Sequence, residues 1–249
     1  ADNKGQIMAH ILGVEETLRS KGELPVNVIF LIEGEEEIGS QNLEAFLTRN
    51  APHLKPDVIV VSDTSMPAQD TPSLTYGMRG ILALDLRVRG THQDLHSGTY
   101  GGIAPNAAQG LGKLLATLHD HNLQIQIPGF YENVRPAQPW EQEEWNRLPS
   151  PAFNLDAIVR WPGFDGEAGF AQLERAWARP TAEINGIGGG YQGEGSKTII
   201  PKEAFAKLTF RLVPNQTPAE IEQKVKAHFS NVCPPFLEIE IITDHGGAP

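Results

Sequence analysis

The residues with the clearest chemical potential are four carboxylates at the end of an apolar run. Residues 28–32 are all apolar, and Glu33, Glu35, Glu36 and Glu37 follow within five positions. Carboxylates crowded at the end of a buried strand repel one another and lose hydration, so a cation, a shared proton or a metal has to offset them. We interpret the cluster as part of a metal site. The alternative is a solvated acidic turn behind an edge strand.

Two more carboxylates are expected at the same edge of the predicted sheet. Asp2 precedes a predicted helix, and Asp63 follows the apolar run 57–61. Taken alone, Asp2 is most simply a helix N-cap. Taken with the acidic cluster and Asp63, it suits a pair of divalent ions, which can share a bridging carboxylate and activate a water between them.

The elements that must position these groups follow a regular order. Apolar spacing predicts a helix over residues 6–20 and another over 43–47, the second capped by Ser40, with strands between and after them over residues 26–32 and 57–61. This order predicts a parallel α/β layer, in which functional groups gather beyond the carboxyl ends of the strands.

The pattern changes after residue 76. A long alternating strand is predicted over residues 77–90, and a capping box at Thr217 with Pro218 in the first helical position predicts a helix to residue 230. The remaining predicted elements are a helix over 105–119 and strands over 182–187, 204–213 and 237–242. Their order is that of a ferredoxin-like α+β layer, with residues 121–180 inserted into it.

Composition excludes several classes of partner. The 249 residues include 20 basic and 31 acidic side chains, giving a net charge of −11, and no basic stripe is present. We therefore expect no nucleic-acid partner. The longest apolar runs are too short for a membrane span, so we expect no membrane partner either. The single Cys233 excludes an intrachain disulfide framework and favours a reducing, cytoplasmic location.

Six short motifs together resemble the M20 metallopeptidases, in particular their cytosolic nonspecific dipeptidase and carnosinase branch. They occur in the order typical of that family and extend over nearly the whole chain. The motifs are Asp2-Asn3-Lys4-Gly5, Glu36-Glu37-Ile38-Gly39-Ser40, Val61-Ser62-Asp63, Asp94-Leu95-His96-Ser97-Gly98-Thr99-Tyr100-Gly101-Gly102, Gly195-Ser196-Lys197-Thr198-Ile199-Ile200-Pro201 and Arg211-Leu212-Val213-Pro214-Asn215-Gln216-Thr217-Pro218.

The resemblance implies an α/β fold with two functional parts. Residues 1–76 would be a partial parallel α/β zinc-peptidase catalytic domain, and residues 77–243 an inserted ferredoxin-like α+β dimerisation or lid domain. Residues 244–249 would be the hinge returning to the catalytic domain. The implied activity is hydrolysis of dipeptides by a water that two Zn²⁺ per subunit activate. Mn²⁺ or Co²⁺ are alternatives in an oxygen-rich site.

The resemblance also implies roles for the carboxylates. Asp2 would bridge the two metals, Glu37 would bind one of them and Asp63 the other. Glu36 would be the general base, which takes a proton from the water and passes it to the leaving amine.

In the second domain the resemblance implies a catalytic and substrate-binding role for His96. It would reach the active site of the partner subunit in a homodimer and stabilise the oxyanion. Thr198, Arg211 and, more weakly, Asn215 would hold the substrate. Without the resemblance, His96 is most simply a structural hydrogen bonder in a loop, and Arg211 a solvated strand arginine.

The sequence also departs from the family. A complete member has a His-x-Asp ligand motif upstream of the Asp-x-Lys-Gly motif and a further His ligand well downstream of the smaller domain. The given 249 residues include neither of these segments. We therefore expect the chain to be an incomplete record of a longer enzyme, weak or inactive by itself. Two alternatives stay open: an N-acyl or N-carbamoyl amino acid amidohydrolase or desuccinylase, and an inactive fragment that serves only as a dimerisation module.

Overall fold

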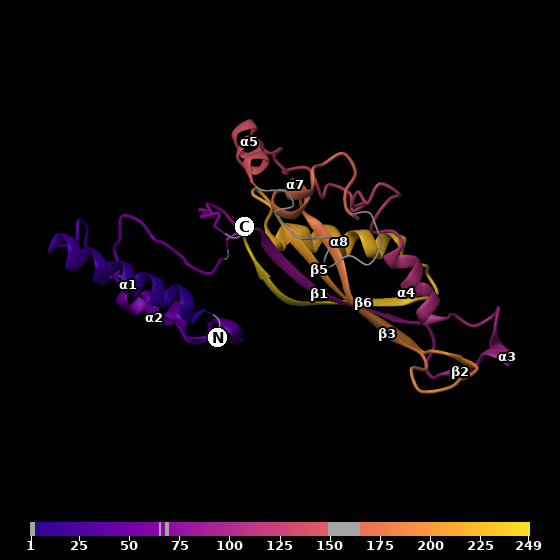
Figure 1. Cartoon of the computed structure of the whole chain (residues 1–249). Coiled ribbons are helices and arrows are strands. Elements are labelled where there is room, and N and C mark those ends of the chain that lie inside the picture. The colour runs from indigo at the N-terminus through magenta and orange to yellow at the C-terminus, as the bar shows by residue number, and fades with distance from the viewer. Residues whose placement is uncertain (1–2, 65, 68–69, 149–164) are drawn as a thin grey trace. The chain divides into compact units, whose positions relative to one another are not determined.

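The protein separates into two compact units, Ala1–Ser65 and Met66–Pro249. The computed structural model in Figure 1 describes residues 3–64, 66–67, 70–148 and 165–249. Residues 66–76, which the sequence grouped with the catalytic part, lie in the second unit. Within the described ranges, none of the helices combines the length and the apolar character needed to cross a bilayer.

The first unit contains the predicted helices. Helix α1 (Lys4–Lys21) ends at Gly22, whose φ of 79° and hydrogen bond to the Leu18 carbonyl are typical of a left-handed C-cap. Helix α2 (Leu43–Asn50) is longer than predicted. The prediction that Ser40 caps α2 is wrong. Asn42 occupies the N-cap, while Ser40 has a φ of 50° and donates its N–H to the Glu35 carbonyl, so it belongs to the preceding turn.

The two strands predicted for this unit are absent from its described residues. Residues 26–32 and 57–61 form no ladder, and their side chains are exposed, as Ile29 at 56% and Val60 at 69% illustrate. A strand is held by hydrogen bonds to a neighbouring strand and by burial of at least one face. Residues 3–64 provide neither for these two segments, so their β-type sequence does not become a sheet here.

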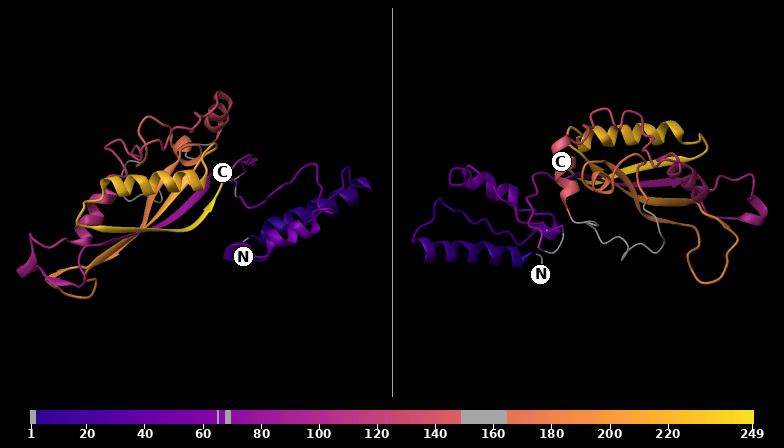
Figure 2. Two further views of the ribbon diagram at one scale, coloured as in Figure 1. Left: turned by 180° about the vertical axis from the view of Figure 1, so that it is seen from behind. Right: turned by 45° about the horizontal axis from the view of Figure 1, so that its top comes forward.

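The second unit has the predicted ferredoxin-like order. Its sheet has the strand order β3-β5-β1-β6, and all three pairings are antiparallel. Helices α4 and α8 pack on one face of this sheet (Figures 1 and 2). The elements are β1 (Gly80–Arg89), α4 (Ala107–Leu115), β3 (Thr181–Gly189), β5 (Glu203–Leu212), α8 (Pro218–Val232) and β6 (Glu238–Gly247). Residues 244–247, expected in a hinge, instead continue β6 along β1 beyond a register shift.

Strict alternation along β5 builds the core. Its buried side chains face the two helices, and each fully buried Leu or Phe contributes roughly 1.5–3 kcal/mol. On the helices, Leu111 and Phe229 are almost fully buried. The buried residues of β5 are Ala204, Ala206, Leu208, Phe210 and Leu212. The predicted N-cap of α8 is confirmed, because the Thr217 side chain accepts a hydrogen bond from the Glu220 amide.

Charged side chains hold parts of the insertion together. It contains α5 (Pro139–Arg147) and α7 (Gln172–Trp177). Arg179 donates two hydrogen bonds of 2.7 Å to the Glu167 carboxylate, and both side chains are nearly buried. The Arg179 guanidinium also lies 4.1 Å from the centre of the Phe170 ring. Such a bidentate, aromatic-flanked arginine fixes orientation as well as charge.

Glu141 connects the insertion to the chain that precedes β1. Its buried carboxylate accepts hydrogen bonds from Arg135 at 2.8 and 2.9 Å, from the Gln138 amide at 2.5 Å and from the Tyr76 hydroxyl at 2.7 Å. The Arg135 hydrogen bonds are the largest cause that lowers the pKa of Glu141 to about 2. Tyr76 thereby ties the chain that enters β1 to helix α5.

This network predicts a pH-dependent loss of stability in Glu141→Gln. We expect the free energy of unfolding at pH 7 to fall by about 2 kcal/mol, since a carboxylate of depressed pKa stabilises the folded state and Arg135 is partly solvent-screened. That contribution is complete above pH 4.5 and disappears as the pH falls toward 2, where the wild-type carboxyl is protonated. Urea unfolding followed by tryptophan fluorescence measures it.

The matched control is Glu143→Gln, which changes an exposed carboxylate on the same helix. It should unfold like the wild type at every pH. A difference between wild type and Glu141→Gln that stayed constant from pH 7 to pH 2 would contradict the assignment.

Candidate active site

The acidic cluster forms a tight turn. Glu36 and Glu37 lie in a short 3₁₀ helix, η1 (Glu36–Ile38), with exposed side chains, and Gly39 ends it with a φ of 88°. The Glu35 carboxylate accepts two hydrogen bonds of 2.9 Å from the Asn42 side chain. Glu35 therefore holds the turn together, a role that the sequence did not reveal.

A hydrogen-bonded contact joins the start of α1 to Asp63. The Asn3 side chain donates to the Ser62 carbonyl at 2.7 Å and to the Asp63 carboxylate at 2.8 Å. His10 lies 2.5 Å from the Ser62 hydroxyl. Two of the three predicted metal-binding segments are thus adjacent in the fold, although Asp2 itself lies outside the described residues.

The donor chemistry of these side chains fits a divalent ion. Glu37 and Asp63 offer carboxylate oxygens, which Zn²⁺, Mn²⁺ and Co²⁺ all accept. Among the described residues, no three His, Cys, Asp or Glu side chains converge as a metal site would require. The structure therefore supplies suitable ligands at Glu37 and Asp63 without an assembled metal-binding geometry.

In the second unit, a small two-stranded platform brings His96 and Thr198 together. Strand β2 (Leu95–His96) pairs with β4 (Ile199–Ile200), and the Ser97 amide donates to the Thr198 carbonyl at 3.1 Å. The Asp94 carboxylate accepts from the Lys202 amide at 2.9 Å. On this platform the His96 Nε2 atom lies 3.1 Å from the Thr198 hydroxyl, across 102 residues of sequence. Two predicted site residues therefore form one exposed polar pair.

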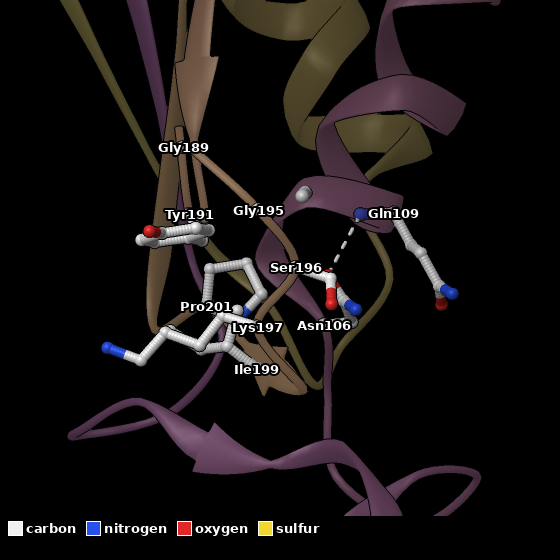
Figure 3. A pocket seen from close by; sticks show the side chains of 11 residues that line it. Asn106, Gln109, Gly189, Tyr191, Gly195, Ser196, Lys197, Ile199 and Pro201 are labelled. Carbon is white, nitrogen blue, oxygen red and sulfur yellow. Dashed lines mark hydrogen bonds between the residues drawn. The ribbon is translucent and has the colours of Figure 1, made fainter. Parts of the chain in front are cut away.

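A cavity of about 590 Å³ lies beside the chain that leads to Thr198 (Figure 3). It separates the first turn of α4, where Asn106 caps the Gln109 amide, from the glycine-rich segment 189–197. Among the described residues that line it, Lys197 alone is charged, and its ammonium lies 5.6 Å from the centre of the Tyr191 ring. Neither His96 nor Thr198 lines it, so it borders the platform without containing its polar pair.

Arg211 lies on the sheet face opposite the helices, near the end of β5. Its neighbours in register are Ile81 and Thr181. Burial, followed by the positive charge of Arg211, lowers the pKa of Arg79, while Glu183 has the opposite effect. The Glu183 carboxylate therefore already offsets part of the repulsion between the two guanidinium groups, and Arg79 also donates to the Arg179 carbonyl at 3.3 Å. The sequence did not single out Arg79, because its proximity to Arg211 arises only in the folded chain.

Asn215 has a simpler structural explanation. It is exposed, with a φ of 73° in the turn between β5 and α8, and Asn is one of the few residues that tolerate this conformation. The neighbouring Gln216 is buried and fixes the turn by accepting from the Val213 amide and donating to the Phe130 carbonyl. The backbone conformation thus accounts for Asn215 without a substrate.

Strand β5 lies between the residues that are expected to bind the substrate. Arg211 lies eight residues beyond Glu203, where β5 begins, and the platform with Thr198 precedes that beginning. At about 3.3 Å per residue, the two ends are about 26 Å apart. Figure 1 shows β2 and α3 (Ser97–Tyr100) beyond the end of the sheet opposite to the first residues of β1. Within one chain, Arg211 and the His96–Thr198 pair therefore do not meet.

Sequence comparison relates the chain to two dipeptidases. The chain is 35% identical to the Beta-Ala-His dipeptidase of Mus musculus over 93% of its length and 32% identical to the Cys-Gly metallodipeptidase dug1 of Schizosaccharomyces pombe, also over 93%. These alignments cover 47% and 49% of the two relatives, so the chain spans about half the length of the curated relatives it matches.

Solved structures give the same result. Human carnosine dipeptidase 1 superposes with a TM-score of 0.74 at 32% identity, covering 98% of this chain and 53% of that one. The M20 family metallo-carboxypeptidase Sso-CP2 from Sulfolobus solfataricus gives 0.77 at 34%, covering 99% and 56%. Residues 76–236 match the peptidase dimerisation domain of the M20 family. The order of strands and helices, the likeness to these relatives and this domain match together establish that the chain belongs to the M20 peptidases.

Proposed function

We propose that this protein is a metal-dependent dipeptidase in which two copies of the chain build each complete active site. The observation that carries the proposal is the polar pair of His96 and Thr198 on its two-stranded platform. A hydroxyl and an imidazole N–H held side by side are donors suited to the oxyanion that forms when water attacks a peptide bond. Relatives named for Beta-Ala-His and Cys-Gly substrates support dipeptides as the substrate class.

The carboxylates of the first unit take the metal and base roles. Asp2, Glu37 and Asp63 would hold two Zn²⁺ per subunit, with Mn²⁺ or Co²⁺ as alternatives. When bound, these ions supply a water of lowered pKa and polarise the scissile carbonyl. Glu36 is exposed beside Glu37 on η1 and accepts the proton of the attacking water as general base.

The second unit binds and orients the substrate. His96 and Thr198 donate to the developing oxyanion. Arg211, with the positive charge of Arg79 beside it, holds the terminal carboxylate of the dipeptide. Asn215 is a weaker substrate-binding candidate, because the turn already accounts for it.

The length of β5 supports a site shared between subunits. A dipeptide extends over about 7 Å, whereas about 26 Å of strand β5 lies between Glu203 and Arg211, and Thr198 lies on the platform before Glu203. One dipeptide can contact both groups only if they come from different chains. Homodimerisation through the domain matched at residues 76–236 would bring them together. The cytoplasmic location stays a prediction from cysteine usage.

The first prediction from the proposed function concerns the substrate and the metal. The native protein that contains this chain should carry two zinc ions per chain, hydrolyse dipeptides, lose activity with a chelator and regain it with Zn²⁺. Hydrolysis of N-acyl or N-carbamoyl amino acids but not of dipeptides would establish the amidohydrolase alternative. Absence of both metal and turnover would favour the dimerisation module. Elemental analysis and a ninhydrin assay measure these outcomes.

A second prediction tests the general base. In the native protein, Glu36→Gln should retain its metal and lower kcat by about 10²–10⁴-fold, the range typical of a lost general base. Glu33→Gln is the matched control, since Glu33 is an exposed carboxylate in the same segment. If Glu36→Gln kept the wild-type rate, Glu36 would not be the base.

A third prediction tests the shared site by mixing two inactive variants, Glu36→Gln and His96→Asn. In a mixed dimer, one of the two sites combines an intact Glu36 from one chain with an intact His96 from the other. Random exchange of subunits should restore about a quarter of wild-type activity, because half of the dimers are mixed and each has one working site. If both residues acted within one chain, the exchanged mixture would stay inactive.

A further inference from the structure

The environment of His96 contains a second contact that the proposed function does not use. His96 is the N-cap of α3, and its Nδ1 atom lies 3.0 Å from the Gly98 amide nitrogen. The first amides of a helix have no partner within the helix, and Ser, Thr, Asn or Asp usually accept from them. Here an imidazole ring takes that place.

This contact determines where the imidazole proton is. A backbone N–H can only donate, so Nδ1 of His96 must present its lone pair to Gly98. The neutral ring therefore carries its proton on Nε2, and Nε2–H donates to the Thr198 hydroxyl at 3.1 Å. A flipped ring would place carbon atoms at both positions and lose both hydrogen bonds.

The position of the His96 ring also depends on the absence of a side chain at Gly98. A Cβ atom added to Gly98 would lie 2.8 Å from Cε1 and 3.1 Å from Nδ1 of His96. The first distance is shorter than real Cβ contacts, so any side chain would displace the ring. Because the backbone of Gly98 is helical, alanine is compatible with its dihedral angles, and the His96 ring is the obstacle.

We propose that Gly98 is a positioning residue for the reaction: its amide holds His96 in the Nε2–H tautomer and its missing side chain leaves room for the ring. Nε2–H is thereby presented as a donor on the side where Thr198 lies. The ring needs no rotation or proton exchange before it donates to an oxyanion. The consequence for turnover rests on the proposed function, whereas the tautomer does not.

The test is nuclear magnetic resonance of the ¹⁵N-labelled protein at about pH 9, where imidazole is neutral. We expect Nδ1 of His96 to resonate as an unprotonated nitrogen and to show scalar coupling to the Gly98 amide nitrogen through the hydrogen bond. The coupling is decisive, because an unconstrained imidazole also favours the Nε2–H form. His96→Asn assigns the signals. A protonated Nδ1, or no coupling, would overturn the proposal.

Two variants separate this role from a general structural one. Gly98→Ala should lose the coupling and give averaged ring signals, whereas Gly112→Ala should leave both unchanged because a Cβ at Gly112 meets nothing within 4 Å. Thr198→Val removes the other partner of the ring and should retain the Gly98 coupling. If Thr198→Val abolished the coupling, Thr198 and not Gly98 would orient the ring. Thr198→Val also keeps the test valid if Gly98→Ala fails to fold.

Kinetics of the native protein then separate the two proposals. Gly98→Ala should lower kcat at least 10-fold with little change in KM, because a misdirected oxyanion donor acts mainly in the transition state. Gly112→Ala should keep wild-type kcat. Loss of the coupling with unchanged kcat would support the positioning of His96 by Gly98 and contradict the catalytic role of His96. Unchanged ring signals in Gly98→Ala would overturn the positioning role itself.

Discussion

Strand β5 is the constraint on which the second unit depends. It pairs with β1 on one side and β3 on the other, and its inward row from Ala204 to Leu212 packs against α4 and α8. Thr198 lies just before this strand, Arg211 lies on it, and His96 contacts Thr198, so the length of β5 sets the spacing between Arg211 and the His96–Thr198 pair. A strand buried on one face and paired along both edges cannot bend enough to bring its ends together. The proposed sharing of a site between two chains follows from this rigidity.

The second unit could largely be predicted from sequence because its signals are local. Period-2 alternation located β5 and β1 to within a few residues, and the Thr217 capping box located the start of α8. These features act through contacts within a few residues or through burial of one face. The ferredoxin-like order followed from them. The extension of β6 through residues 244–247 was missed, since its glycines offer no alternating side chains. The short β2–β4 pairing and helices α3, α5 and α7 were also missed.

Features that depend on distant partners could not be predicted in the same way. Residues 26–32 have a strand-like sequence, but a strand also needs a neighbour, and the described part of the first unit offers none. The role of Glu35 depends on a hydrogen bond to Asn42 across a turn. Arg79 becomes relevant only because folding brings its charge close to that of Arg211. The motifs identified which residues carry chemistry, whereas pairing and turn geometry determine which of them touch.

The group that accepts from Nε2–H of His96 affects whether this N–H can later donate to an oxyanion. A hydrolytic site needs a carboxylate base and an N–H donor, and the two form a strong charge-assisted hydrogen bond if they are adjacent. Such a bond would occupy the donor before any oxyanion forms. In this chain the hydrogen-bond partners of the His96 ring are the Gly98 amide and the Thr198 hydroxyl, and Nε2–H donates to that neutral hydroxyl. A neutral hydroxyl is a weaker acceptor than an oxyanion, so the donor can change partner when negative charge develops. The Gly98 amide keeps the ring in the form that makes this exchange possible.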